Sequence, residues 1–120
     1  MFDHIGLKVS DLDASARFYE AALQPLGFVL CTRDAAGAGF GPEGAPALWL
    51  ASTQGATPAA AHVALRATSR GAVEAFHKAG VAAGGRDHGG PGLRADYGPR
   101  YFAAFLIDPD GNNVEAVCTR

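Results

Sequence analysis

The chain has 120 residues, of which 48% are hydrophobic and 18% charged, and its formal net charge is -2. This length predicts one domain, and this composition is typical of a globular protein rather than a disordered one. The slight negative charge argues against a nucleic-acid partner, because phosphate binding requires a basic surface.

The two cysteines, Cys31 and Cys118, match neither a zinc-site spacing nor a disulfide framework. The N-terminus lacks a basic segment followed by an apolar run, and no stretch approaches the roughly 18 apolar residues of a membrane span. We therefore expect a cytoplasmic protein with reduced thiols and no membrane partner.

The first half of the chain is predicted to contain a strand, a helix and further strands. Residues 2–10 alternate between apolar and polar positions, as in a strand with one buried face. A helix is expected to begin at the Ser10–Asp13 segment, which offers a hydroxyl cap and acidic residues, and to end at Pro25. Three segments follow, two expected as strands and the glycine-rich middle one as a turn or short strand: 28–32, 37–41 and 47–51.

The second half repeats the first. Residues 62–67 match residues 4–9 at a shift of 58 positions, with His62 on His4. A helix is predicted over 69–83, and two strands follow a long glycine-rich loop, at 101–107 and 113–118. Such a repeat indicates two modules, which we place at residues 1–52 and 60–120, joined by a linker at 53–59.

Two repeated modules would be related by an approximate two-fold axis, so that equivalent residues face a shared cavity. His4 is then equivalent to His62, and Glu115 is equivalent to Trp49. Glu115 has apolar neighbours in its strand, and a carboxylate in a buried strand is costly unless another group pairs with it.

Two imidazoles and one carboxylate suit a divalent ion such as Zn, Ni, Mn or Fe. The prediction is therefore a metal held by His4, His62 and Glu115. The alternative is that both histidines are ordinary buried residues and that Glu115 pairs with Arg66 or Lys8.

The chain resembles the vicinal oxygen chelate superfamily, which contains glyoxalases, bleomycin-resistance proteins and dioxygenases. The resemblance depends on three stretches, residues 2–19, 62–65 and 105–115. It implies an α+β fold in which two tandem βαβββ modules form a curved mixed sheet around a cavity that holds a divalent ion. By the same resemblance, His4, His62 and Glu115 are the ligand positions, and Glu115 also acts as the catalytic acid or base.

Trp49 departs from the pattern of glyoxalase I, in which a ligand, usually a carboxylate, stands at this place. An indole cannot bind a metal, so the site has at most three protein ligands and glyoxalase I chemistry itself is not expected. The three-ligand members of the superfamily, such as fosfomycin-resistance transferases and extradiol dioxygenases, are closer analogues. The glycine-rich segment 89–94, followed by Tyr97 and Tyr101, resembles a glyoxalase-like branch of the superfamily.

The leading hypothesis is a metal-dependent enzyme acting on a small oxygen-rich molecule. The reaction classes, in order, are lyase or isomerase chemistry through an enediolate, group transfer to an epoxide, and ring-opening dioxygenation. The alternative is a metal-free small-molecule binding protein of the bleomycin-resistance kind.

Further residues are expected to line the cavity. Lys8 and Arg66 either attract an anionic substrate or are rim charges that reach water. Trp49, Tyr97 and Tyr101 are expected to form an apolar wall. A homodimer is expected because the two modules leave sheet edges that need partners, and whether the metal ligands come from one chain or two stays open.

Overall fold

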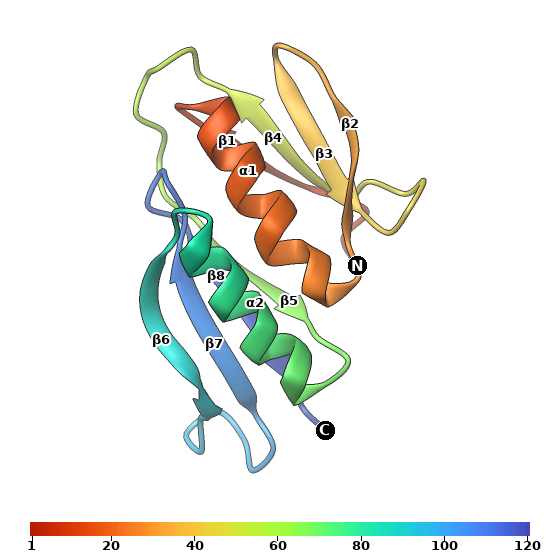
Figure 1. The fold of residues 1–120 in the computed structure, drawn as a ribbon, viewed down its shortest axis with the longest axis vertical. Coiled ribbons are helices and arrows are strands. Elements are labelled where there is room, and N and C mark those ends of the chain that lie inside the picture. The colour runs from red at the N-terminus through yellow and green to blue at the C-terminus, as the bar shows by residue number, and fades with distance from the viewer.

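The computed structural model describes all 120 residues, which form two βαβββ modules in tandem (Figure 1). The first contains β1 (Ile5–Val9), α1 (Leu12–Leu23), the short 3-10 helix η1 (Gln24–Leu26), β2 (Val29–Arg33), β3 (Gly37–Gly41) and β4 (Leu48–Ser52). The second contains β5 (His62–Arg66), α2 (Arg70–Ala82), β6 (Arg86–Leu93), β7 (Phe102–Ile107) and β8 (Asn113–Cys118). The expected α+β class and the tandem repeat are confirmed.

The eight strands are divided into two sheets of four, with the orders β1-β4-β3-β2 and β5-β8-β7-β6. The pairs β1/β4 and β5/β8 are parallel and the other pairs are antiparallel. The register repeats as well, since Gly6 lies opposite Trp49 in the first sheet and Ala64 lies opposite Glu115 in the second. Trp49 and Glu115 therefore occupy equivalent positions, as the sequence repeat indicates.

The glycine-rich segment that we expected to be a loop is in fact strand β6, which pairs with β7. The prediction was wrong because glycine has a low intrinsic strand preference, whereas here the pairing with Phe102–Ile107 supplies the ladder. The register shifts on both sides of Gly89, and the φ of Gly89 is 147°, a conformation that side chains disfavour.

The two helices lie side by side, each against one face of its own sheet (Figure 1). Asp11 caps α1 by accepting from the backbone N–H of Ala14, and Ser69 caps α2 by accepting from that of Ala72. The cap of α1 is thus the carboxylate of Asp11 rather than the hydroxyl of Ser10. Neither helix has the length and apolar character needed to cross a bilayer. The opposite face of each sheet carries no helix.

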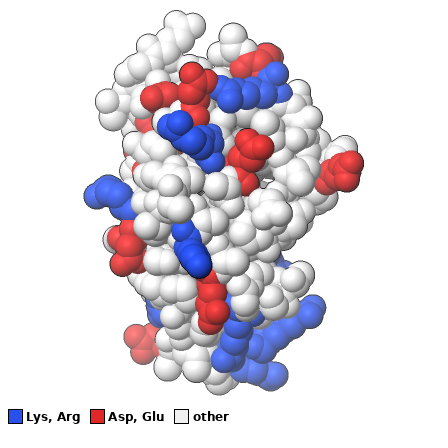
Figure 2. Space-filling model, in the orientation of Figure 1, with Lys and Arg blue, Asp and Glu red and all other residues white.

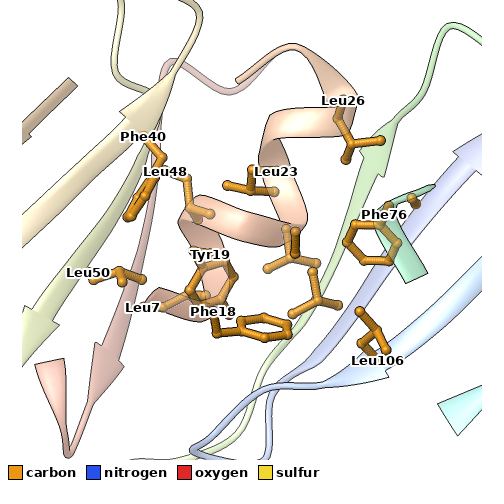
Figure 3. Packing of buried hydrophobic residues seen from close by; sticks show 14 of the residues in the cluster. Leu7, Phe18, Tyr19, Leu23, Leu26, Phe40, Leu48, Leu50, Phe76 and Leu106 are labelled. Carbon is orange, nitrogen blue, oxygen red and sulfur yellow. The ribbon is translucent and has the colours of Figure 1, made fainter. Parts of the chain in front are cut away.

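Both modules contribute to one hydrophobic core of 21 buried residues (Figure 3). The ring of Phe18, on α1, reaches the second module and lies where a Cβ atom on Gly85 would be. A Cβ atom on Gly80 of α2 would clash with Cδ1 of Leu106. Gly85 therefore leaves room for Phe18 of the first module, and Gly80 allows α2 to pack closely on β7 of its own sheet.

The turn between β7 and β8 also joins the modules. Asp110 accepts hydrogen bonds from the backbone N–H of Ser10, at 3.0 Å to each carboxylate oxygen, and from the Ser10 hydroxyl. Asp108, in the same turn, accepts from the hydroxyl of Tyr19 on α1. These two carboxylates belong to residues 105–115, one of the stretches that carry the superfamily resemblance. Their hydrogen bonds to Ser10 and Tyr19 join the second module to the first.

Candidate functional site

Glu115 is the centre of a polar cluster on the open face of the second sheet. Its neighbours in β8, Val114 and Ala116, point into the core, so alternation places Glu115 on the other face. Glu115 is nevertheless only 3% exposed. Nε2 of His62 lies 3.2 Å from Oε1 of Glu115, and the hydroxyl of Tyr101 donates a hydrogen bond to Oε2.

The orientation of His62 follows from its other ring nitrogen. Nδ1 of His62 lies 3.1 Å from the backbone carbonyl oxygen of Asn113, and a carbonyl oxygen can only accept, so Nδ1 carries a proton. In the neutral imidazole, Nε2 then presents a lone pair to the carboxylate of Glu115. Two lone pairs 3.2 Å apart repel each other unless a proton on one of the two atoms, or a metal ion bound by both, lies between them.

Tyr101 holds the second oxygen of Glu115. This hydrogen bond, with burial and the negative charge of Glu115, raises the pKa of Tyr101 to about 12. Tyr101 is therefore a neutral hydrogen-bond donor at physiological pH. The ring of Tyr97 makes an edge contact with that of Tyr101, with centroids 5.3 Å apart, and forms the solvent side of the cluster.

An aromatic ring and an arginine extend the cluster toward β6. Phe105 lies opposite Glu115 in the β7–β8 register, and its ring stacks with that of His62 at 6.5 Å between centroids. The guanidinium carbon of Arg94 lies 5.4 Å from the Phe105 ring centroid. The sequence reasoning did not assign a role to Phe105 or Arg94, although alternation along residues 102–107 would have placed Phe105 on the face of Glu115.

The equivalent face of the first module carries Trp49 and Lys8. The Trp49 indole covers Gly39, where an added Cβ would lie 2.7 Å from the ring, and it is 37% exposed. Lys8 and Arg66 are exposed on their strands and neither forms an ion pair. The alternative in which one of these two cations pairs with Glu115 is therefore wrong in this structure.

His4 lies apart from this cluster. Its Nδ1 is 2.7 Å from Oδ1 of Asp3, and its side chain is 61% exposed. It borders a mainly apolar cavity of about 150 Å³ between the modules, whose walls include Ile5, Phe28 and Leu65. No three His, Cys, Asp or Glu side chains of the chain meet in a metal-binding group. The chain thus brings His62 and Glu115 together without His4, and the three-ligand set stays a prediction.

Solved structures with the same fold cover nearly the whole chain. A glyoxalase/bleomycin resistance protein from Albidiferax ferrireducens is 30% identical, with a TM-score of 0.84 and coverage of 100% of this chain and 99% of that one. A glyoxalase-related enzyme from Fulvimarina pelagi is 22% identical, with a TM-score of 0.73 and coverage of 95% and 84%. A glyoxalase/bleomycin resistance protein/dioxygenase family enzyme from Burkholderia phytofirmans is 17% identical, with a TM-score of 0.73 and coverage of 98% of both chains. The last two show the shared fold only.

The search of curated proteins gave no significant match. The family model described as the Glyoxalase/Bleomycin resistance protein/Dioxygenase superfamily matches residues 1–116. This match spans both modules and agrees with their tandem βαβββ topology. The chain belongs to the glyoxalase/bleomycin resistance protein/dioxygenase superfamily.

Proposed function

We propose that the protein is a metal-dependent enzyme of the lyase, isomerase or transferase type, acting on a small oxygen-rich molecule at the open face of the second module. The observation that supports this most directly is the pair of Nε2 of His62 and Oε1 of Glu115, 3.2 Å apart. The remaining polar atoms of both side chains are held by other groups, so these two atoms are left facing each other.

The donor set fits a divalent ion. Ligating histidines usually donate their second ring N–H to a carbonyl or carboxylate, and ligating carboxylates are usually hydrogen-bonded in turn. Asn113 and Tyr101 supply these two supports here. Imidazole and carboxylate together suit Zn, Ni, Mn or Fe, and such an ion would act as a Lewis acid that polarises a substrate oxygen.

The residues of the chain have separate roles in this proposal. Glu115 would accept a proton from the substrate once its carboxylate has left the ion. Tyr101 fixes the orientation of that carboxylate through Oε2. The ring of Phe105 stacks with that of His62 and forms part of the wall beside it.

His4 is proposed to come from a second copy of the chain. β1 and β5 each form an edge of their sheets, and an unpaired edge favours association with another strand. His62 is the first residue of β5 and His4 directly precedes β1, and the two histidines are equivalent in the sequence repeat. In a homodimer that pairs the first module of one protomer with the second module of the other, His4 would complete the site formed by His62 and Glu115 of the partner.

A second candidate function is metal-free binding of a small molecule. Two observations favour it. The exposed indole of Trp49 occupies the position in the first module that Glu115 occupies in the second, and an indole cannot bind a metal. His4 also lies apart from His62 within one chain. In that case His62 and Glu115 contact each other without an ion, and the open face binds its ligand through aromatic rings.

Metal analysis separates the two candidates. Protein purified without chelators and incubated with Mn, Fe, Ni and Zn in turn is expected to retain about one ion per protomer of at least one metal. His62→Ala and Glu115→Gln should weaken binding by at least about 100-fold, because each removes a ligand. His77→Gln is the matched control, since His77 lies on α2 and pairs with Asp87. Retention below about a fifth of an ion per chain for every metal would favour the metal-free function.

A further inference from the structure

We propose that Arg94 binds a negatively charged group of the substrate, so that the site selects small oxygen-rich anions, with a carboxylate as the charged group. The proposal rests on the proposed function for the location of the site, namely the open face that carries His62 and Glu115. It does not depend on whether a metal is bound there.

Strand β6 is shaped around the Arg94 side chain. A Cβ atom on Gly89 would lie 3.2 Å from Nη2 of Arg94, and one on Gly92 would lie 3.1 Å from Nη1. Nη2 also donates a 2.7 Å hydrogen bond to the carbonyl oxygen of Gly90. The glycines of β6 therefore leave the space in which this guanidinium lies, and the side chain is ordered before any ligand arrives.

The guanidinium lies on the face that carries the polar cluster. It sits over the ring of Phe105, 5.4 Å from the centroid, and that ring stacks with the imidazole of His62. Phe105 is also opposite Glu115 in the strand register. Phe105 thus contacts both the guanidinium of Arg94 and the imidazole of His62, so an anionic group on Arg94 would lie on the same face as a substrate oxygen at His62 and Glu115.

The charge of Arg94 is not neutralised by any carboxylate of the chain. The ion pairs of the structure involve His4, Arg33, His62 and His77, and only Arg33 among the lysines and arginines takes part. A guanidinium has five N–H donors, so the bond to Gly90 leaves several available to a carboxylate. Figure 2 shows Lys and Arg gathered at the end of the molecule that carries the β6–β7 connection and the C-terminus, which adds to the attraction for an anion.

Arg94 differs in this respect from the two cations that the sequence pointed to. Lys8 and Arg66 are exposed, and nothing in the structure orders their charged ends. Binding an anion with either would therefore cost the entropy of ordering the side chain. Arg94 is already ordered by its contacts with the glycines of β6, so this cost is smaller for Arg94. The planar fork of an arginine also matches a carboxylate in two parallel hydrogen bonds, which a lysine cannot do.

The substrate class follows from the two separate binding groups. Arg94 would bind the charged group and the pair of His62 and Glu115 would bind the reacting oxygens, so we expect these on different parts of the substrate. A suitable probe is a catechol that bears a carboxylate para to one hydroxyl, since it holds two vicinal oxygens and a charge at opposite ends of a rigid ring. Its primary amide is the matched neutral probe.

Calorimetric titration of both probes into wild-type protein, Arg94→Gln, Arg94→Lys and Arg100→Gln tests the proposal. Wild-type protein should bind the carboxylate at least about tenfold more tightly than the amide. Arg94→Gln should abolish that preference, Arg94→Lys should retain only part of it, and Arg100→Gln should retain it. Arg100 lies in the same β6–β7 connection, is exposed and makes no ion pair, so it reports the general effect of removing a charge.

The proposal would be overturned by equal affinity of the wild-type protein for the two probes, or by an undiminished preference in Arg94→Gln. An equal loss of the carboxylate preference in Arg100→Gln would also overturn it, because the preference would then come from the overall positive charge of this region. The titrations are run with metal-incubated and with chelator-treated protein. A carboxylate preference that survives chelation and depends on Arg94 supports this proposal even if the metal analysis fails.

Discussion

The hydroxyl of Tyr19, on the first helix, donates a 2.6 Å hydrogen bond to Oδ2 of Asp108, in the turn before the last strand. Both residues are buried, and they belong to different modules. Asp108 also accepts from the backbone N–H groups of Asp110 and Asn112 and from the Asn112 side chain, each at 2.8 Å. The buried carboxylate of Asp108 therefore has hydrogen-bond partners from both modules.

Replacing Tyr19 with Phe should lower the free energy of unfolding by about 1.5–3 kcal/mol, the usual value for a hydrogen bond to a charged group. The substitution removes one donor from Asp108 and leaves the ring packing in place. Denaturant titration of the wild type and the variant measures the difference. A loss below about 0.5 kcal/mol would mean that the remaining donors are sufficient for Asp108.

The same contact predicts an alkaline limit of stability. Burial, together with the charge of Asp108, raises the pKa of Tyr19 well above its usual value of 10.0. A raised pKa in the folded state means that the stabilising contribution is complete below pH 10.0 and is lost as the pH rises above it. Tyr19→Phe should therefore show a weaker fall of unfolding free energy with alkaline pH than the wild type. Parallel slopes for the two proteins would contradict this.

The packing of α2 on β7 provides a matched pair of substitutions. Gly80→Ala places a Cβ against Leu106 and should destabilise the protein by about 1–3 kcal/mol, the usual cost of overpacking. Gly71→Ala lies in the same helix, where the nearest atom to an added Cβ is 3.9 Å away. It should stabilise the protein by about 0.4–1 kcal/mol, because alanine loses less backbone entropy. Thermal unfolding of both variants measures the contrast, and equal effects would show that the packing of α2 on β7 is not constrained at Gly80.

A mixing experiment tests whether the metal site spans two chains. His4→Ala and Glu115→Gln protomers should each bind metal poorly alone. After unfolding and refolding together, the mixed dimers should contain one intact site, because one protomer supplies a normal His4 and the other a normal Glu115. Recovery of about a quarter of the wild-type metal content at equal mixing is expected for random pairing. No recovery, with dimers present by light scattering, would mean that each site lies within one chain.

The packing of Trp49 can be followed through its fluorescence, because it is the single tryptophan of the chain. Gly39→Ala should displace the indole and shift its emission, since a Cβ there would lie 2.7 Å from the ring. Gly6→Ala is the control, because Gly6 lies opposite Trp49 on the other side and has nothing within 4 Å of its Cβ position. A shift of similar size in both variants would show that the indole does not rest on Gly39.

The sequence predicted most of the fold because the repeat and the apolar–polar alternation can both be read directly from the order of the residues. His62 matching His4, and Trp49 matching Glu115, were enough to indicate two modules and their register. Strand β6 was missed because its glycines carry no side-chain pattern, and its pairing depends on Phe102–Ile107 further along the chain.

The candidate site was predicted less completely. Alternation along β8 identified Glu115, but its contact with Tyr101 depends on how the β6–β7 connection returns over the sheet. The separation of His4 from His62 depends on the packing of Phe18 against Gly85 and on the turn at Asp108. Both are tertiary contacts that no local pattern encodes.

The linker contributes little to this arrangement. Backbone hydrogen bonds of residues 54–60 reach no further than Ser52 and Thr53, whereas Asp108, Asp110 and the helix contact hold the modules together. The covalent connection acts mainly by raising the local concentration of one module near the other. Two separate polypeptides, cut between Gln54 and Ala60, should therefore reassemble by fragment complementation, and the first module would behave as a tight-binding ligand of the second.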